Sequence, residues 1–124
     1  MNGIKITSGS ITLEADLNDT LTAAKIWEAL PIDGRASRWG DEVYFEIPVH
    51  AEQESGARAE VEVGELGYWP MGSAFCIFFG PTPVSTDQRP RAYSPVNILG
   101  KVKGDATRLS SIKSGDAVRI ERRA

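Results

Sequence analysis

The sequence has little of several residue types from which functional sites are commonly built. Its 124 residues include one cysteine, one histidine and two methionines. A lone cysteine excludes an internal disulfide, and one histidine with one cysteine makes no recognisable zinc site. We therefore expect no disulfide framework, no metal centre and no cofactor.

An excess of basic residues is also missing. The formal net charge is -3 at pH 7, whereas general nucleic-acid binders carry a surplus of Lys and Arg. No apolar run is long enough to cross a bilayer, and the N-terminus lacks the charged-then-apolar layout of a signal peptide. We expect a cytoplasmic protein that binds neither nucleic acid nor membrane. The sequence leaves its oligomeric state open.

Aromatic residues and the single cysteine gather in the stretch 64–80. Pro70 and Gly72 predict a type I turn that folds a strand at 66–69 against one at 74–79. Alternation places Phe75, Ile77 and Phe79 on one face of the second strand, which we expect to lie in the core. The opposite face is apolar too, so it needs cover from a neighbouring element or a bound molecule.

The remaining pattern predicts one mainly β domain spanning residues 1–124. One helix is expected near 21–30, capped by Asn18, Asp19 or Thr20 and ended by a proline, and a second short helix after Asp105. Segment 80–95 contains four prolines and reads as a long, mobile or functional loop. Many short strands favour a closed or nearly closed β-barrel. These strands are expected at 4–6, 11–13, 34–39, 43–47, 60–63, 96–102 and 117–120.

Tyr44, Trp69 and Phe78 are candidates for the wall of a binding pocket, because alternation turns each away from the barrel interior. The alternative is that they pack beneath the 80–95 loop. His50 has acidic residues nearby and is either a general base, a ligand contact or an exposed loop histidine. Cys76 is either a reactive thiol or a small buried apolar residue.

Several motifs resemble those of cyclophilins. Residues 72–77 (Gly-Ser-Ala-Phe-Cys-Ile) are similar to the Gly-Ser-Gln-Phe-Phe-Ile run of that family, and residues 97–102 to its Val-Val-Phe-Gly-Lys-Val strand. A small prokaryotic cyclophilin-like family resembles the chain more closely. It carries Gly-Tyr-Trp-Pro, here 67–70, and a Phe-Phe-Gly-x-Thr-Pro ending, here 78–83. The resemblance implies a closed eight-stranded antiparallel barrel with two short helices.

Cyclophilins are peptidyl-prolyl isomerases, so the resemblance also implies where catalytic residues should stand. With Ile47-Pro48 as the anchor, Phe45 takes the place of the catalytic arginine and His50 that of a pocket phenylalanine. Gln53 matches the family glutamine, whereas Cys76 replaces the phenylalanine that walls the proline pocket. The site of an isomerase is therefore degenerate, and no catalytic residue is assigned.

Three functions follow from these observations. The leading one is a binding module for a peptide or small molecule, with a site formed by Tyr44, Phe45, His50, Gln53, Trp69, Cys76 and Phe78. The second is a weak prolyl isomerase whose arginine has moved, for which Arg35, Arg38 and Arg58 are candidates. The third is an interaction domain whose apolar surface pairs with another chain or with its own copy.

Overall fold

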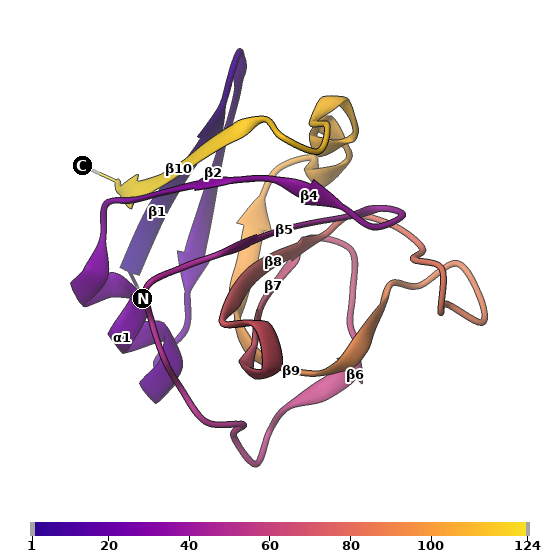
Figure 1. Cartoon of the computed structure of the whole chain (residues 1–124), viewed down its shortest axis with the longest axis horizontal. Coiled ribbons are helices and arrows are strands. Elements are labelled where there is room, and N and C mark those ends of the chain that lie inside the picture. The colour runs from indigo at the N-terminus through magenta and orange to yellow at the C-terminus, as the bar shows by residue number, and fades with distance from the viewer. Residues whose placement is uncertain (1, 124) are drawn as a thin grey trace.

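Antiparallel strands are the main regular structure of the computed structural model, which describes residues 2–123 (Figure 1). The strands within this range are β1 (Asn2–Ser8), β2 (Ile11–Leu17), β3 (Ile32–Arg35), β4 (Ser37–Arg38), β5 (Glu42–Glu46), β6 (Arg58–Glu60), β7 (Glu65–Trp69), β8 (Ala74–Phe78), β9 (Arg91–Lys103) and β10 (Ala117–Arg122). The mainly β class is confirmed. No helix in this range is long and apolar enough to cross a membrane.

The strands form one path of hydrogen-bonded neighbours in the order β3-β10-β1-β2-β9-β7-β8-β5-β4, with β6 paired to β9. The expected closed eight-stranded barrel differs from this in two ways. Ten strands are present among residues 2–123, and hydrogen bonds do not close the path. Its two outer strands are instead consecutive in the chain, separated by Ala36, and β3 packs against β5. The two edge strands, β3 and β4, are therefore joined by the chain itself and by packing, not by a ladder of hydrogen bonds.

The first helix is α1 (Leu21–Ala29), and the hydroxyl of Thr20 caps it by accepting a hydrogen bond from the backbone of Ala23. The second expected helix is a 3-10 helix, η2 (Ala106–Ser111), capped by Asp105 as predicted. A further 3-10 turn, η1 (Pro70–Gly72), stands where the type I turn was expected. It joins β7 to β8, and the central hairpin is confirmed.

The two faces of β8 lie in different clusters of buried side chains. Phe75, Ile77 and Phe79 belong to the main core, as predicted from alternation. The opposite face contributes to a second, smaller cluster, made of Val61, Ala74, Cys76, Phe78, Ala92 and Val96. Protein therefore covers much of the outward face.

Strand β9 supplies most of this cover, and it begins earlier than expected. The segment 80–95 was predicted to be a loop, but β9 starts at Arg91 and contains Pro95. Its first part pairs with β6, and its later part pairs with β7 and β2. The prolines hide this strand in the sequence, because proline lacks the N–H that a central strand donates. The connection that remains is 79–90.

Candidate functional site

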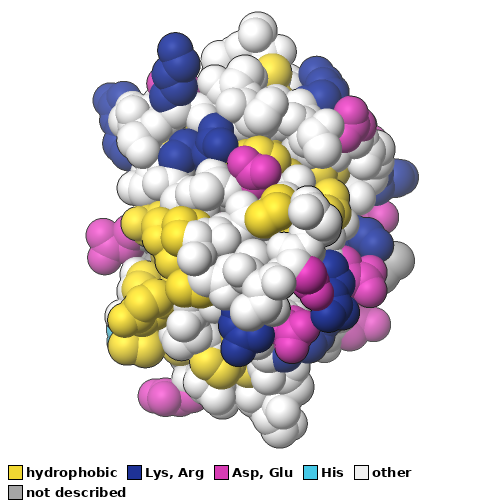
Figure 2. All heavy atoms as spheres, turned by 90° about the vertical axis from the view of Figure 1, so that its right-hand side faces the viewer, with side chains coloured by type: hydrophobic (Ala, Val, Ile, Leu, Met, Phe, Trp, Pro, Cys, Tyr) yellow, Lys and Arg dark blue, Asp and Glu magenta, His cyan; other side chains and the backbone are white. Residues whose placement is uncertain are grey.

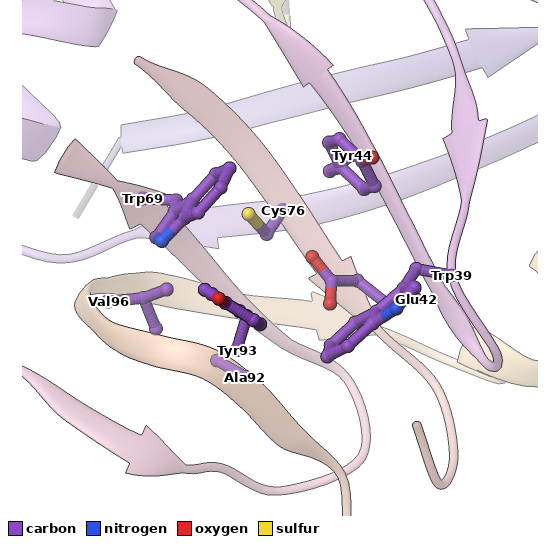
Figure 3. Close-up of a pocket in the computed structure, with 8 residues that line it drawn as sticks. All are labelled: Trp39, Glu42, Tyr44, Trp69, Cys76, Ala92, Tyr93 and Val96. Carbon is purple, nitrogen blue, oxygen red and sulfur yellow. The ribbon is translucent and has the colours of Figure 1, made fainter. Parts of the chain in front are cut away.

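A pocket of about 180 Å³ opens on the outward side of β5, β8 and β7. It lies beside the second cluster, where the start of β9 folds over these strands. Figure 3 shows the side chains around it. The lining residues are Trp39, Glu42, Tyr44, Trp69, Cys76, Ala92, Tyr93 and Val96.

The floor of the pocket is formed where a large side chain and a small one are paired across neighbouring strands. Tyr44 on β5 is paired with Cys76 on β8, which is paired in turn with Gly67 on β7. Side chains that are paired across antiparallel strands lie on the same face of the sheet. A tyrosine therefore stands beside a cysteine, and this step in side-chain size leaves a hollow, whereas Val96 fills the space above Gly67.

Trp39 and Glu42 reach the pocket from one tight turn between β4 and β5. The backbone of Trp39 donates to the carbonyl of Glu42 at 3.0 Å, and Glu42 donates back to Trp39 at 3.2 Å. Gly40 within this turn has a φ of +59°, which glycine adopts without strain. Mutually hydrogen-bonded residues at a hairpin end point to the same face. Both side chains consequently enter the pocket.

Tyr93 stands between the two tryptophans at the rim. Its ring centroid lies 6.2 Å from that of Trp39 and 6.1 Å from that of Trp69, in edge-to-face arrangements. The indole N–H of Trp69 donates to Oγ of Ser94 at 2.7 Å, which fixes the indole ring against β9. Tyr93 itself is 68% exposed. A ligand in the pocket can therefore touch its ring while the ring stays in contact with solvent.

Glu42 is the one acidic residue among the lining side chains, and it is 6% exposed. Burial raises the pKa of its carboxyl to about 7, and the neighbouring Cys76 thiol offsets part of the rise. Within residues 2–123, no Lys, Arg or His forms an ion pair with Glu42. Figure 3 shows the carboxylate pointing inward, near the Cys76 sulfur. The pocket thus contains an acidic group without a counter-charge.

Cys76 is fully covered, and burial together with the Glu42 carboxyl raises the pKa of its thiol well above the usual value. The thiolate is the nucleophilic form of cysteine, and this surrounding disfavours it. The geometry is thus that of a small apolar residue in the pocket floor. No three His, Cys, Asp or Glu side chains in the described range come together as metal ligands would.

The structure places the seven residues named from the sequence in four different surroundings. Tyr44, Trp69 and Cys76 line the pocket. Phe78 lies next to it but is fully buried under the second cluster. Phe45 points the other way, into the main core, where its ring stacks on Phe75 with centroids 5.5 Å apart. Neither phenylalanine is among the pocket's lining residues.

His50 and Gln53 lie in a different hollow, a groove of about 940 Å³ between α1 and the segment 48–54. Nδ1 of His50 lies 3.1 Å from Oγ of Ser73, and His50 is exposed. The acidic neighbours expected to orient it do not do so, since Glu54 instead accepts hydrogen bonds from Thr22. The predicted site is therefore divided between two surfaces.

The three candidate arginines are engaged away from the pocket. Arg58 forms a two-pronged pair with Glu65 at 2.8 and 2.9 Å. Arg38 donates to backbone carbonyls that include that of Ile112, and its guanidinium lies 5.0 Å from the centre of the Phe79 ring. Arg35 donates to a carbonyl near the C-terminal strand. Each guanidinium therefore already has partners elsewhere.

Five lining residues were missed from the sequence: Trp39, Glu42, Ala92, Tyr93 and Val96. Trp39 carried a usable signal, because the Trp-Gly-Asp turn places it directly before a strand. Glu42 reads in the sequence as an ordinary solvated acidic residue at a strand start. Its burial depends on the approach of β9, which local patterns do not reveal.

Comparisons with known proteins agree with this architecture. The family model described as Cyclophilin-like matches residues 2–121. A solution structure of a hypothetical protein from Archaeoglobus fulgidus is 36% identical, covers 98% of this chain and 95% of its own, and superimposes with a TM-score of 0.83. No curated protein matches the chain. From the family match and this structural neighbour, the chain belongs to the cyclophilin-like family.

Proposed function

We propose that this protein is a non-catalytic binding module whose aromatic pocket holds a small organic molecule or one side chain of a peptide. The observation that carries the proposal is the pocket itself, with four aromatic side chains around a single buried carboxyl group. Ligand sites are mostly apolar hollows with a few polar groups that fix the orientation of the ligand. This pocket has that composition.

The size of the pocket limits what enters it. Its volume is about 180 Å³, and a cavity of about 150 Å³ takes up one benzene ring. A ligand with one ring, or an aliphatic group of similar size, therefore suits the space. A longer peptide fits only if one side chain enters while the remainder lies on the surface.

The alternatives have less support. A prolyl isomerase needs a donor that favours the twisted amide over the planar one. Phe45, at the position of the arginine, offers none.

A protein-interaction domain would use exposed apolar side chains such as Met71 and Tyr93. Figure 2 shows hydrophobic side chains gathered over one part of the surface, with charged ones mixed over another. Such a contact would use the same rim, so it is an extension of ligand binding at this place.

A ligand-observed NMR screen with single-ring fragments and short peptides tests the proposal. We expect hits that bind the wild type and are lost in Trp69→Ala, because this change removes one wall of the pocket. An unchanged amide spectrum elsewhere in Trp69→Ala would establish that the variant is folded.

Leu21→Ala is the matched control, since Leu21 is 80% exposed and lines the second groove. Leu21→Ala should bind the same fragments and peptides as the wild type. Hits that survive in Trp69→Ala but disappear in Leu21→Ala would place binding in the groove of His50 and Gln53 and overturn the proposal.

A further inference from the structure

We infer that the ligand of the aromatic pocket is a small organic cation with at least one N–H donor, such as a protonated primary or secondary amine. The inference rests on the proposed function and adds the charge and chemical class of the ligand. Glu42 would accept the N–H, and the rings of Trp39, Tyr44, Trp69 and Tyr93 would surround the cation and its apolar part.

The first argument is the missing counter-charge. Glu42 is 94% buried, since 6% of its surface is exposed. Buried carboxylates in proteins are normally paired with a cation or fully hydrogen-bonded, because removing the charge from water is costly. Within the described residues no side chain donates a hydrogen bond to the Glu42 carboxyl, since the Cys76 thiol donates to the carbonyl of Ala74. An ammonium group in the pocket would supply the partner that the chain itself lacks.

The second argument is the type of wall. The faces of Trp and Tyr rings carry negative partial charge and attract a cation within about 6 Å of the ring centre, with Trp the strongest. Two tryptophans and two tyrosines line the pocket, and no lysine or arginine stands among the lining residues. A protonated amine would therefore be favoured both by the carboxylate at the floor and by the rings around it.

Together these features predict selectivity. An anion is disfavoured because its charge would face Glu42 and the electron-rich ring faces. A neutral molecule of the same shape gains the apolar contacts but leaves the carboxylate without a counter-charge. A quaternary ammonium ion keeps the attraction to the rings but has no N–H to donate. Charge and donor are both required for full affinity.

The test compares cyclohexylammonium with cyclohexanol, which have the same shape and differ in charge. Their affinities for the wild-type protein are measured by NMR titration at a pH above the pKa of Glu42. We expect cyclohexylammonium to bind about tenfold more tightly, because it makes a charge-assisted hydrogen bond. In Glu42→Gln this preference should disappear while cyclohexanol binds as before.

Glu46→Gln is the matched control, because Glu46 lies on the same strand and is exposed. It should retain the wild-type preference. Equal binding of both compounds by the wild type would overturn this inference and leave the proposed function intact. Binding of neither of them, or of any screened fragment, would overturn the proposed function as well.

A second measurement does not depend on the variant being folded. The side-chain carboxyl ¹³C resonance of Glu42 is followed in the wild type during both titrations. We expect it to shift with cyclohexylammonium and to stay nearly constant with cyclohexanol. If the Glu42 resonance stayed constant while cyclohexylammonium bound saturably, the inference would be overturned, because the ammonium group would then lie away from Glu42.

Discussion

Glu42 is the residue whose surroundings differ most from those its sequence context suggests. It stands at the start of a strand, next to an acidic residue, yet the turn at 39–42 and the approach of β9 cover it. Such cover disfavours the charged form of a carboxyl group, since the protein replaces water without supplying a cation. The charge state of the Glu42 carboxyl should therefore change with pH and with ligand binding.

The free energy of unfolding should fall as the pH rises from about 4.5 to about 7. The Glu42 carboxyl has a pKa of about 7 in the folded state, against an ordinary value of 4.5. Between these values the folded state holds more protons than the unfolded chain, so stability decreases with pH. The contribution is at most about 3 kcal/mol. Urea denaturation at a series of pH values measures it.

Substitution separates this effect from that of other groups. Glu42→Gln cannot ionise, so its stability should exceed that of the wild type above pH 7 and its pH dependence should be flatter. Glu46→Gln should keep the wild-type dependence, because Glu46 is exposed. Parallel curves for the wild type and Glu42→Gln would contradict burial as the cause.

At the scale of elements, the pocket results from side-chain size along three paired strands. Gly67 on β7 allows Val96 of β9 to approach closely: a Cβ at position 67 would lie 2.8 Å from Cγ2 of Val96. A similar approach occurs at Gly72, where a Cβ would lie 2.6 Å from the ring of Trp69. Because these glycines have no Cβ, β9 packs closely against the hairpin at Gly67 and the Trp69 indole packs closely at Gly72.

Gly67→Ala should therefore destabilise the protein, by about 1–3 kcal/mol, because the added methyl overpacks the contact between β7 and β9. Chemical denaturation of the variant and the wild type measures the difference. Gly56→Ala is the control, since a Cβ there would meet nothing within 4 Å and the position has no positive φ. Equal stability of Gly67→Ala and Gly56→Ala would show that β9 moves aside without cost.

At the scale of the whole molecule, the three arginines that could replace the catalytic one are engaged away from the pocket. Arg35, Arg38 and Arg58 bind carbonyls or carboxylates on other surfaces. Gln53, the one residue retained from the isomerase pattern, lies in the separate groove beside α1. The family's fold is present, but Phe45 and Gln53, which stand at two positions of the isomerase pattern, lie in the core and in this groove.

We expect the wild type to produce little or no acceleration of cis–trans exchange in a short Xaa-Pro peptide, measured by NMR exchange spectroscopy. Rotation about the prolyl bond has a barrier of roughly 20 kcal/mol, and lowering it requires a donor that acts on the twisted amide. Clear catalysis in the wild type would contradict this expectation. Its loss in Gln53→Ala or in one of the variants Arg35→Ala, Arg38→Ala and Arg58→Ala would then identify the displaced site.

Local patterns in the sequence were sufficient to determine most of the strands, the central hairpin and the inward face of β8, but not the first part of β9. Alternation with a period of two decides which side chains share a face, so Phe75 and Ile77 were predicted to lie in the core. On β5, alternation turns Tyr44 outward and so places Phe45 on the opposite face, whereas the alignment with cyclophilins put Phe45 in the site. The structure agrees with the alternation, since Phe45 is buried against Phe75.

Only the tertiary structure decided what covers the outward face and which residues meet there. Trp39, Trp69 and Tyr93 are far apart in the chain. They meet because β8 pairs with both β5 and β7, and β7 pairs in turn with β9. The tertiary structure also decided that Tyr44 and His50 lie in different hollows. Tyr44 on β5 lines the aromatic pocket, whereas His50, in the segment after β5, lines the groove beside α1. Alternation specifies a face but not its neighbour, because pairing between distant strands depends on contacts that no local pattern contains.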